Sequence, residues 1–294
     1  MYKSVSYKRH NIHQVFGEKM RKSSVAVLVL TLLLTLTLYM AVSTQQQTPT
    51  LELAVQTQPA AQKTPVTWAK TYGNVGEDIA TSVAATPDGG CIIVGKTSSF
   101  GAGGYDFWVV KLDSNGSIQW QKSYGGEGDD EAYGVAVTDD GYVVVGSTNS
   151  FNAGSSYDFW VLKLNSTGGI VWQKTCGGSG TDIAYGVVFD QAGDDRHIVV
   201  VGDTSSFGAG DYDFWALRLN SSTGEQIWQY TYGGLEPDNV RGVAFAGNGY
   251  IVAGYTQSFG VSNRDVWVLR LNMDGTLQWQ NLYNCGGNDS AFSV

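Results

Sequence analysis

Two series of aspartates recur at regular intervals along the sequence, and carboxylates repeated in this way can bind a metal ion. One series follows a glycine-rich stretch and consists of Asp78, Asp130, Asp182 and Asp238; the other stands two residues before a tryptophan and consists of Asp106, Asp158, Asp213 and Asp265. Calcium takes six to eight oxygen ligands in one site, and no copy has the DxDxDG density that supplies them. We therefore expect these aspartates to stabilise turns, and we expect no cofactor. If a metal is bound, the pattern of carboxylates favours calcium.

Histidine and cysteine offer little more for catalysis. His197, the only histidine beyond the first 22 residues, lies in an insertion, FDQAGDDRHIVVVG (189–202), which we expect to lengthen a surface turn and to leave this histidine solvated. Cys91, Cys176 and Cys285 are odd in number and lack CxxC spacing, so they favour neither a disulfide framework nor a zinc site. The sequence does not indicate a serine and an aspartate that would join this histidine in a Ser-His-Asp relay. We expect a protein that is not an enzyme.

The tryptophans show that the chain is built from repeats. One series is Trp68, Trp120, Trp172, Trp228 and Trp279, at intervals of 52, 52, 56 and 51 residues, and a second runs in step as Trp108, Trp160, Trp215 and Trp267. We expect both series to have structural roles. A period of this length indicates a propeller, a solenoid or another repeat array.

Each period contains four segments typical of β-strands. In the second copy they are AYGVAVT (132–138), YVVVGST (142–148), DFWVLKL (158–164) and IVWQKTCG (170–177). In the third segment Trp160 and Leu162 point to one side and Phe159 to the other, so both faces of the sheet are apolar. Stacking such sheets around an axis buries both faces, which favours a β-propeller over a solenoid. We predict an all-β fold with four complete blades of four antiparallel strands.

The chain divides into three parts. Residues 1–42 form a basic leader and an uncharged run, 25–42, that is typical of a signal or membrane anchor; it would contact the membrane if it is not cleaved, and Met20 is a second possible start. Residues 43–66 form a Thr/Gln/Pro-rich linker. Residues 67–294 form the propeller, with repeats at approximately 68–119, 120–171, 172–227 and 228–278 and a partial copy at 279–294. We expect a secreted or membrane-anchored protein on the extracellular face.

The two ends of the repeat region do not complement each other. The region begins on a fourth-strand sequence, TWAKTYG at 67–73, and ends at 287–294 on a sequence like that of a first strand. A further blade would have a first and a fourth strand but no second or third. We therefore expect partial strands at both ends and an incomplete ring, as in a truncated or split version of a longer propeller.

Two stretches carry a resemblance to known families. LNSSTGEQIWQY (219–230) resembles the blade-end signature of quinoprotein-type (PQQ-like) propellers, and WQKSYGGEGDDEAYGVAVTDDGYVVVGSTNSF (120–151) resembles the repeat of exported archaeal and bacterial surface proteins. The resemblance covers residues 68–294 and implies an exported β-propeller. A quinoprotein dehydrogenase would also need calcium, an aspartate base and, in many members, an adjacent cysteine pair, and the chain has no adjacent cysteines.

Charge excludes one class of partner. The first 22 residues hold six of the 18 basic residues, and the rest of the chain has 12 basic against 26 acidic residues. Because phosphate binding needs clustered lysine and arginine, we exclude nucleic acid.

The loops SFGAGGYD, SFNAGSSYD, SFGAGDYD and SFGVSNRD are equivalent and would lie on one rim. They present a candidate binding surface of Phe100, Tyr105, Phe151, Tyr157, Phe207, Tyr212, Phe259 and Arg264. Alternatively, the phenylalanines pack between neighbouring blades. The sequons at Asn115, Asn165, Asn220 and Asn288 are either glycan acceptors or turn residues.

We expect an exported, non-catalytic module that binds a protein or a carbohydrate at the cell surface. The alternatives are a quinoprotein-like propeller domain of an oxidoreductase or assembly factor, and a purely structural surface-layer repeat.

Overall fold

The computed structural model describes residues 68–151, 156–192, 195–260, 263–284 and 286–294, which form sixteen β-strands and no helix. All of these residues lie in the second of two compact units, residues 64–294. The leader and the linker predicted from the sequence lie outside the described residues. Within the described ranges, no helix is long and apolar enough to cross a membrane.

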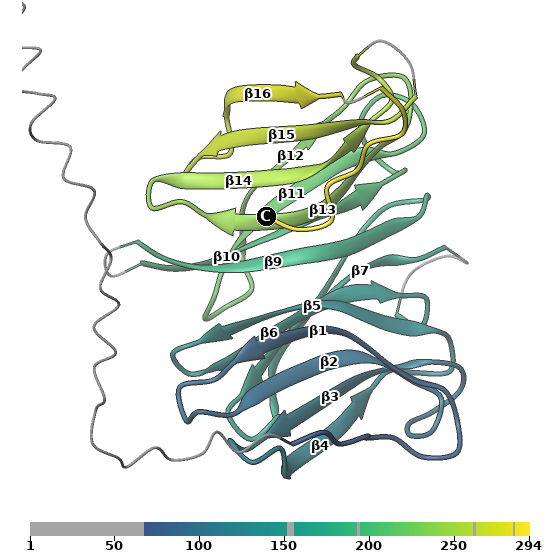
Figure 1. Ribbon diagram of the computed structural model, residues 1–294, viewed down its shortest axis with the longest axis vertical. Coiled ribbons are helices and arrows are strands. Elements are labelled where there is room, and N and C mark those ends of the chain that lie inside the picture. The colour runs from purple at the N-terminus through teal and green to yellow at the C-terminus, as the bar shows by residue number, and fades with distance from the viewer. Residues whose placement is uncertain (1–67, 152–155, 193–194, 261–262, 285) are drawn as a thin grey trace, which may run out of the picture. The chain divides into compact units, whose positions relative to one another are not determined.

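The strands form four antiparallel sheets, each a meander in chain order (Figure 1). The first two sheets contain β1 (Asp78–Ala85), β2 (Cys91–Thr97), β3 (Asp106–Leu112) and β4 (Ile118–Tyr124), then β5 (Asp130–Thr138), β6 (Gly141–Thr148), β7 (Asp158–Asn165) and β8 (Ile170–Cys176). The last two contain β9 (Asp182–Ala192), β10 (Asp195–Thr204), β11 (Asp213–Asn220) and β12 (Gln226–Tyr232), then β13 (Asp238–Phe245), β14 (Gly249–Thr256), β15 (Asp265–Asn272) and β16 (Leu277–Tyr283). The predicted blades of four strands are confirmed.

Apolar side chains on both faces of the middle sheets form the cores between neighbouring sheets. In β7, Trp160 and Leu162 belong to the core shared with the first sheet, whereas Phe159 belongs to the core shared with the third. Successive side chains of a strand point to opposite faces, so one strand supplies both cores. A sheet of this kind is stable only with a neighbour on each side.

A phenylalanine of one sheet lies against a tryptophan of the next at each of the three junctions. All of these rings are buried. The ring centroids are 4.6 Å apart for Phe107 and Trp160, 4.6 Å for Phe159 and Trp215, and 4.7 Å for Phe214 and Trp267. Tilted aromatic pairs at this distance are favourable beyond the area that they bury.

The other tryptophan series joins each fourth strand to the following sheet. Trp120 donates its indole N–H to the Ser166 carbonyl at 3.1 Å. Its ring also covers Gly168, which has a φ of +74°, and a Cβ there would lie 2.9 Å from the ring. Only glycine satisfies both the left-handed turn and this close approach. Trp172 and Trp228 donate to carbonyls of the next sheet in the same way.

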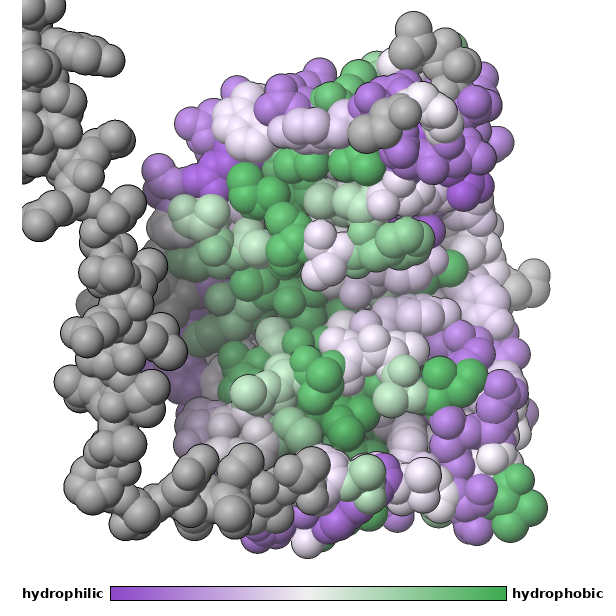
Figure 2. Space-filling model, viewed as in Figure 1, coloured by the Kyte–Doolittle hydropathy of each residue, from purple (hydrophilic) through white to green (hydrophobic). Residues whose placement is uncertain are grey.

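The first strands lie next to one another in the order β1, β5, β9 and β13, and the four sheets stay open rather than closing into a ring. Figure 2 shows that the densest group of apolar residues lies over these strands, with polar residues around it. Half-buried Val137, Phe189 and Phe245, each near the end of its first strand, pack against the cores between the sheets.

Residues at both ends of the described region make blade-like contacts without forming a strand. Tyr72, before β1, donates its O–H to the Gly116 carbonyl at 2.7 Å, and Tyr124 of β4 makes the same bond to the next sheet at the same distance. After β16, the Asp289 N–H donates to the Arg264 carbonyl at 2.8 Å. The N–H of the first residue of β5, of β9 and of β13 likewise donates to a carbonyl of the rim loop in the preceding sheet. The predicted fourth-strand and first-strand sequences thus take the corresponding places.

The insertion at 189–202 differs from the prediction. It does not lengthen a turn; it lengthens both strands of a hairpin, so that β9 has 11 residues and β10 has 10, against 9 and 8 for β5 and β6. The ladder continues through the pair of His197 and Asp190 to the pair of Asp195 and Ala192. The expectation that His197 is solvated is wrong: it is half-buried, and its Nδ1 lies 3.0 Å from Nη2 of Arg218.

Replacing a phenylalanine at a junction should unfold the protein far more readily than replacing one in a loop. Phe159→Ala removes a fully buried ring between two sheets and should lower the free energy of unfolding by about 3–5 kcal/mol. Phe151→Ala is the matched control, since that ring is 44% exposed and should cost about 1 kcal/mol. Urea denaturation of both variants measures the difference; equal losses would contradict the junction's role.

Candidate functional site

The loops between second and third strands carry the predicted rim phenylalanines. Phe151, Phe207 and Phe259 are 44, 40 and 36% exposed, and Phe100 is half-buried. Each ring also packs on the tryptophan of its own sheet, at centroid distances of 5.0, 5.1, 5.2 and 6.2 Å in that order. These rings are therefore held in place by packing on one side and remain accessible on the other.

The tyrosines of the same loops are half-buried and connect each loop to the next sheet. The backbone carbonyls of Tyr105, Tyr157 and Tyr212 accept the N–H groups of Asp130, Asp182 and Asp238 at 2.6, 2.7 and 2.7 Å. The Tyr105 O–H also donates to Glu77, and Lys96 lies over the Tyr105 ring at 4.2 Å. Arg264 replaces tyrosine in the fourth loop; it is exposed, and its guanidinium lies over the Tyr255 ring at 4.6 Å.

The first-strand aspartates close the corners between successive sheets. Asp130 Oδ2 accepts hydrogen bonds from the Gly126 N–H at 2.9 Å and from the Ser150 hydroxyl at 2.7 Å. Asp78, Asp182 and Asp238 each accept a backbone N–H four residues earlier, and Asp78 and Asp182 also accept a serine hydroxyl. These bonds engage the Oδ2 atom of each carboxylate with the chain's own donors, whereas the buried Oδ1 atoms of Asp130 and Asp182 have no hydrogen-bond partner.

The third-strand aspartates are buried behind the rim loops. Asp106 and Asp213 are 1 and 2% exposed, and each accepts a loop N–H, from Ala102 at 2.8 Å and Ala209 at 2.6 Å. Their Oδ1 atoms, and those of Asp158 and Asp265, have no hydrogen-bond partner. Burial raises the pKa of Asp106 and of Asp213 to about 6. The hydrogen bond from the loop N–H lowers each pKa, and the negative charge of the neighbouring first-strand aspartate raises it further.

These raised pKa values make the stability depend on pH. Each of these carboxyl groups has a pKa of about 6 in the folded chain and 3.8 in the unfolded chain. Between pH 3.8 and about 6 the folded chain therefore binds more protons than the unfolded chain. The protein should therefore become more stable as the pH falls from about 7 to about 4.5, which thermal unfolding would measure. In an Asp106→Asn/Asp213→Asn variant this rise should be smaller; an undiminished rise would contradict the assignment.

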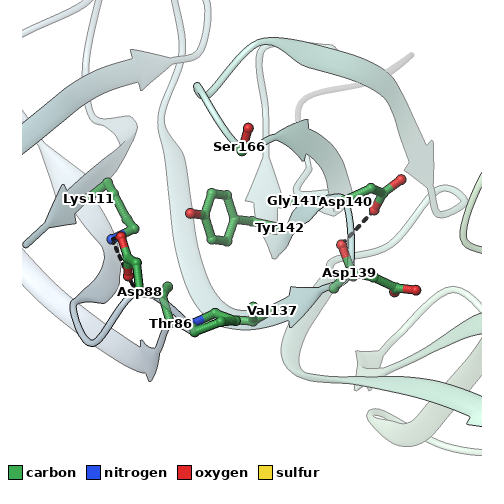
Figure 3. Close-up of a pocket in the computed structure, with 11 residues that line it drawn as sticks. Thr86, Asp88, Lys111, Val137, Asp139, Asp140, Gly141, Tyr142 and Ser166 are labelled. Atoms are coloured by element: carbon green, nitrogen blue, oxygen red, sulfur yellow. Dashed lines mark hydrogen bonds and ion pairs between the residues drawn. The ribbon is translucent and has the colours of Figure 1, made fainter.

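The opposite end of the sheets holds a pocket of about 310 Å³ between the first and second sheets. Figure 3 shows Asp88 and Lys111 on one side of it, Asp139 and Asp140 on the other, and the Tyr142 ring between them. Lys111 is 3% exposed and lies 2.8 Å from Asp88 Oδ2. The hydrogen bond from Lys111 holds the pKa of Asp88 well below its usual range. The other two carboxylates, of Asp139 and Asp140, pair with Arg196 and Lys163, so each charged group of this pocket has a partner of opposite charge.

Lys111 belongs to a series of four cations, three buried and one half-buried, that the sequence analysis missed. Lys163, 1% exposed, contacts Asp140 and the Thr138 hydroxyl; Arg218 lies 2.8 Å from buried Asp190; Arg270 contacts Asn248. All four cations stand at one position of the third strand and meet the hairpin between the first and second strands. The sequence does indicate this series: each third strand has one basic residue among apolar ones, and each copy has an Asp or Asn in the hairpin between its first and second strands.

Removing the partner of a buried lysine should destabilise the protein more than removing the adjacent aspartate, which pairs with an exposed arginine. Asp140→Ala leaves the Lys163 ammonium buried without its carboxylate and should cost about 3 kcal/mol. Asp139→Ala is the control, because Asp139 pairs with the half-exposed Arg196 and should cost less than about 1 kcal/mol. Urea denaturation at neutral pH compares them, and a similar loss in both would show that burial of Lys163 gives its ion pair no special weight.

The structure describes two of the three cysteines and all four sequon asparagines. Cys91 and Cys176 are free thiols, and Cys285 lies outside the described residues. Asn115, Asn165 and Asn288 are exposed and Asn220 is half-buried. Asn165 builds its turn by accepting backbone N–H groups from Thr167 and Gly169 at 3.0 and 2.8 Å. Among the described residues, no three His, Cys, Asp or Glu side chains converge to hold a metal ion.

The four meander sheets and the cores between them define a β-propeller module. No protein-family model matches the chain, and no curated protein matches it. Among solved structures, the Dos1 propeller aligns with it at 11% sequence identity and a TM-score of 0.45, over 69% of this chain. The alignment covers 47% of the Dos1 propeller chain, so this chain matches about half of that protein's length.

Proposed function

We propose that this β-propeller is a non-catalytic module of the cell surface whose rim loops bind carbohydrate. The observation that carries the proposal is the set of partly exposed phenylalanine rings, one per sheet, at equivalent positions in three successive sheets. A polysaccharide presents sugar rings at regular intervals, and apolar sugar faces pack on aromatic rings that a scaffold holds rigidly. Successive sugar units of one polysaccharide could therefore contact the equivalent phenylalanines of successive sheets.

The other accessible features support the rim as the binding surface. The pocket at the opposite end is lined by Asp88, Asp139 and Asp140, and each of these carboxylates is paired with a cation of the chain. A ligand there would have to displace those pairs and leave a lysine charge buried. The rim rings, by contrast, need lose no partner when a ligand covers them.

The proposed location rests on the leader. An uncharged run at 25–42 follows a basic segment and precedes a linker rich in Thr, Gln and Pro, the order of an export or anchor signal followed by a tether.

Binding to a panel of soluble polysaccharides, measured by calorimetry, tests the proposal. Removing the rings together, as Phe151→Ala/Phe207→Ala/Phe259→Ala, should weaken binding by about fivefold per ring, which corresponds to about 1 kcal/mol for each contact. Val171→Ala is the control, because this exposed valine lies on β8, away from the rim, and its loss should leave affinity unchanged.

Unchanged affinity in the triple variant would remove the rim from the proposal. Failure to bind any polysaccharide would instead favour a protein ligand or a purely structural surface repeat.

A further inference from the structure

The first strand of each sheet has a β-bulge at the same place, three residues after its corner aspartate. The bulged residues, which have no partner in the ladder, are Thr81, Tyr133, Tyr185 and Arg241. A bulge turns its side chain away from the regular alternation of the strand, and proteins use this to direct a side chain towards a site.

The residue at the bulge changes from sheet to sheet, although the sheets otherwise repeat the same aspartates, glycines and tryptophans. A neighbouring position, the next-to-last residue of the second strand, also changes and is Lys96, Ser147, Asp203 or Tyr255. None of these residues belongs to the cores between sheets. Ser147, Asp203 and Tyr255 are nevertheless buried, so these positions combine packing between sheets with a residue type that differs from sheet to sheet.

The bulged residues form a continuous stack across the second, third and fourth sheets. The Tyr133 and Tyr185 ring centroids are 5.2 Å apart, and the Arg241 guanidinium lies 4.5 Å from the Tyr185 ring and 5.6 Å from the Tyr255 ring. Arg264 of the fourth rim loop lies 4.6 Å from the Tyr255 ring. Two guanidinium groups thus flank one tyrosine, within the range of cation–π attraction.

The two arginines differ in their counter-charges. Arg241 Nη1 lies 3.1 Å from Oδ2 of buried Asp203, a carboxylate that also accepts the Asn239 amide N–H at 2.6 Å and the Val240 N–H at 2.7 Å. Arg264 is exposed and forms no salt bridge with any residue that the structure describes. Its guanidinium therefore keeps its N–H donors for a ligand.

The charge of the chain limits what that ligand can be. Beyond the first 22 residues there are 26 acidic against 12 basic residues, so a chain of anions is repelled by the surface as a whole. A ligand with a single carboxylate can approach the Arg264 guanidinium with much less of this repulsion. A planar guanidinium binds a carboxylate through two parallel N–H bonds.

We propose that Arg264, stacked on Tyr255 beside Arg241, binds the carboxylate of a single acidic sugar unit in an otherwise neutral glycan. The inference rests on the proposed carbohydrate binding and adds the class of sugar. Phe259 begins the same loop and is 36% exposed, so it offers a ring to a neighbouring neutral unit. The half-buried Tyr133 and Tyr185 continue the surface across the third and second sheets.

Calorimetry with two oligosaccharides, one containing a single uronic acid and the other its carboxyl-reduced counterpart, tests the inference on the full chain. The acidic form should bind at least about tenfold more tightly, as one charge-assisted hydrogen-bonded pair allows. Arg264→Tyr, which installs the residue that the other three loops carry, should abolish this preference and keep binding of the neutral form. Arg264→Lys should retain part of it, because the charge remains and the planar fork is lost.

Arg196→Gln is the matched control, since it removes the same charge from the opposite end of the sheets and should leave the preference intact. Equal affinity for the two oligosaccharides, or a preference that survives Arg264→Tyr, would overturn the inference and leave the proposed function standing. Binding of neither oligosaccharide, or binding only of a short peptide with a free carboxyl terminus, would contradict both.

Discussion

The structure depends on the burial of both faces of every sheet that has two neighbours. Alternating side chains of β7 enter two different cores, and a phenylalanine of each sheet meets a tryptophan of the next. Dispersion and hydrophobic burial at these junctions hold sheets that could not stand alone in water. The strand order, the turn glycines and the corner hydrogen bonds are all arranged around this packing. The repeat is therefore a unit of packing, and each copy is stable only as part of the array.

Polar groups enter this apolar array in a regular way. At one end of the sheets, first-strand aspartates accept backbone and serine donors, and third-strand aspartates hold the rim loops. At the other end, a buried or half-buried cation of each third strand meets an acceptor in the hairpin between the first and second strands. Buried charges are tolerated only when they are paired and hydrogen-bonded. The same solution recurs in each sheet because each sheet has the same surroundings.

Positions outside this packing are where the repeats diverge. The bulge of the first strand and the end of the second strand vary between sheets, and they combine in a tyrosine–arginine stack beside the rim loops. A repeat scaffold keeps constant what holds the sheets together and leaves the remaining surface free to differ. The proposed ligand contacts lie on this variable surface, next to phenylalanines that are the same in all four loops.

The sequence by itself determined the repeat, the four strands in each copy and the need for a neighbour on each face. These follow from alternation and turn residues, which are local properties of the chain. It also placed the aspartates, tryptophans and rim phenylalanines at equivalent positions.

Only the tertiary structure decided that the insertion at 189–202 pairs as a longer hairpin and that lysines such as Lys163 are buried beside an aspartate. It alone aligned Tyr133, Tyr185 and Arg241 in one stack. The physical reason is that burial and stacking depend on which side chains of different sheets come within a few ångströms of each other, and local sequence carries no record of that distance.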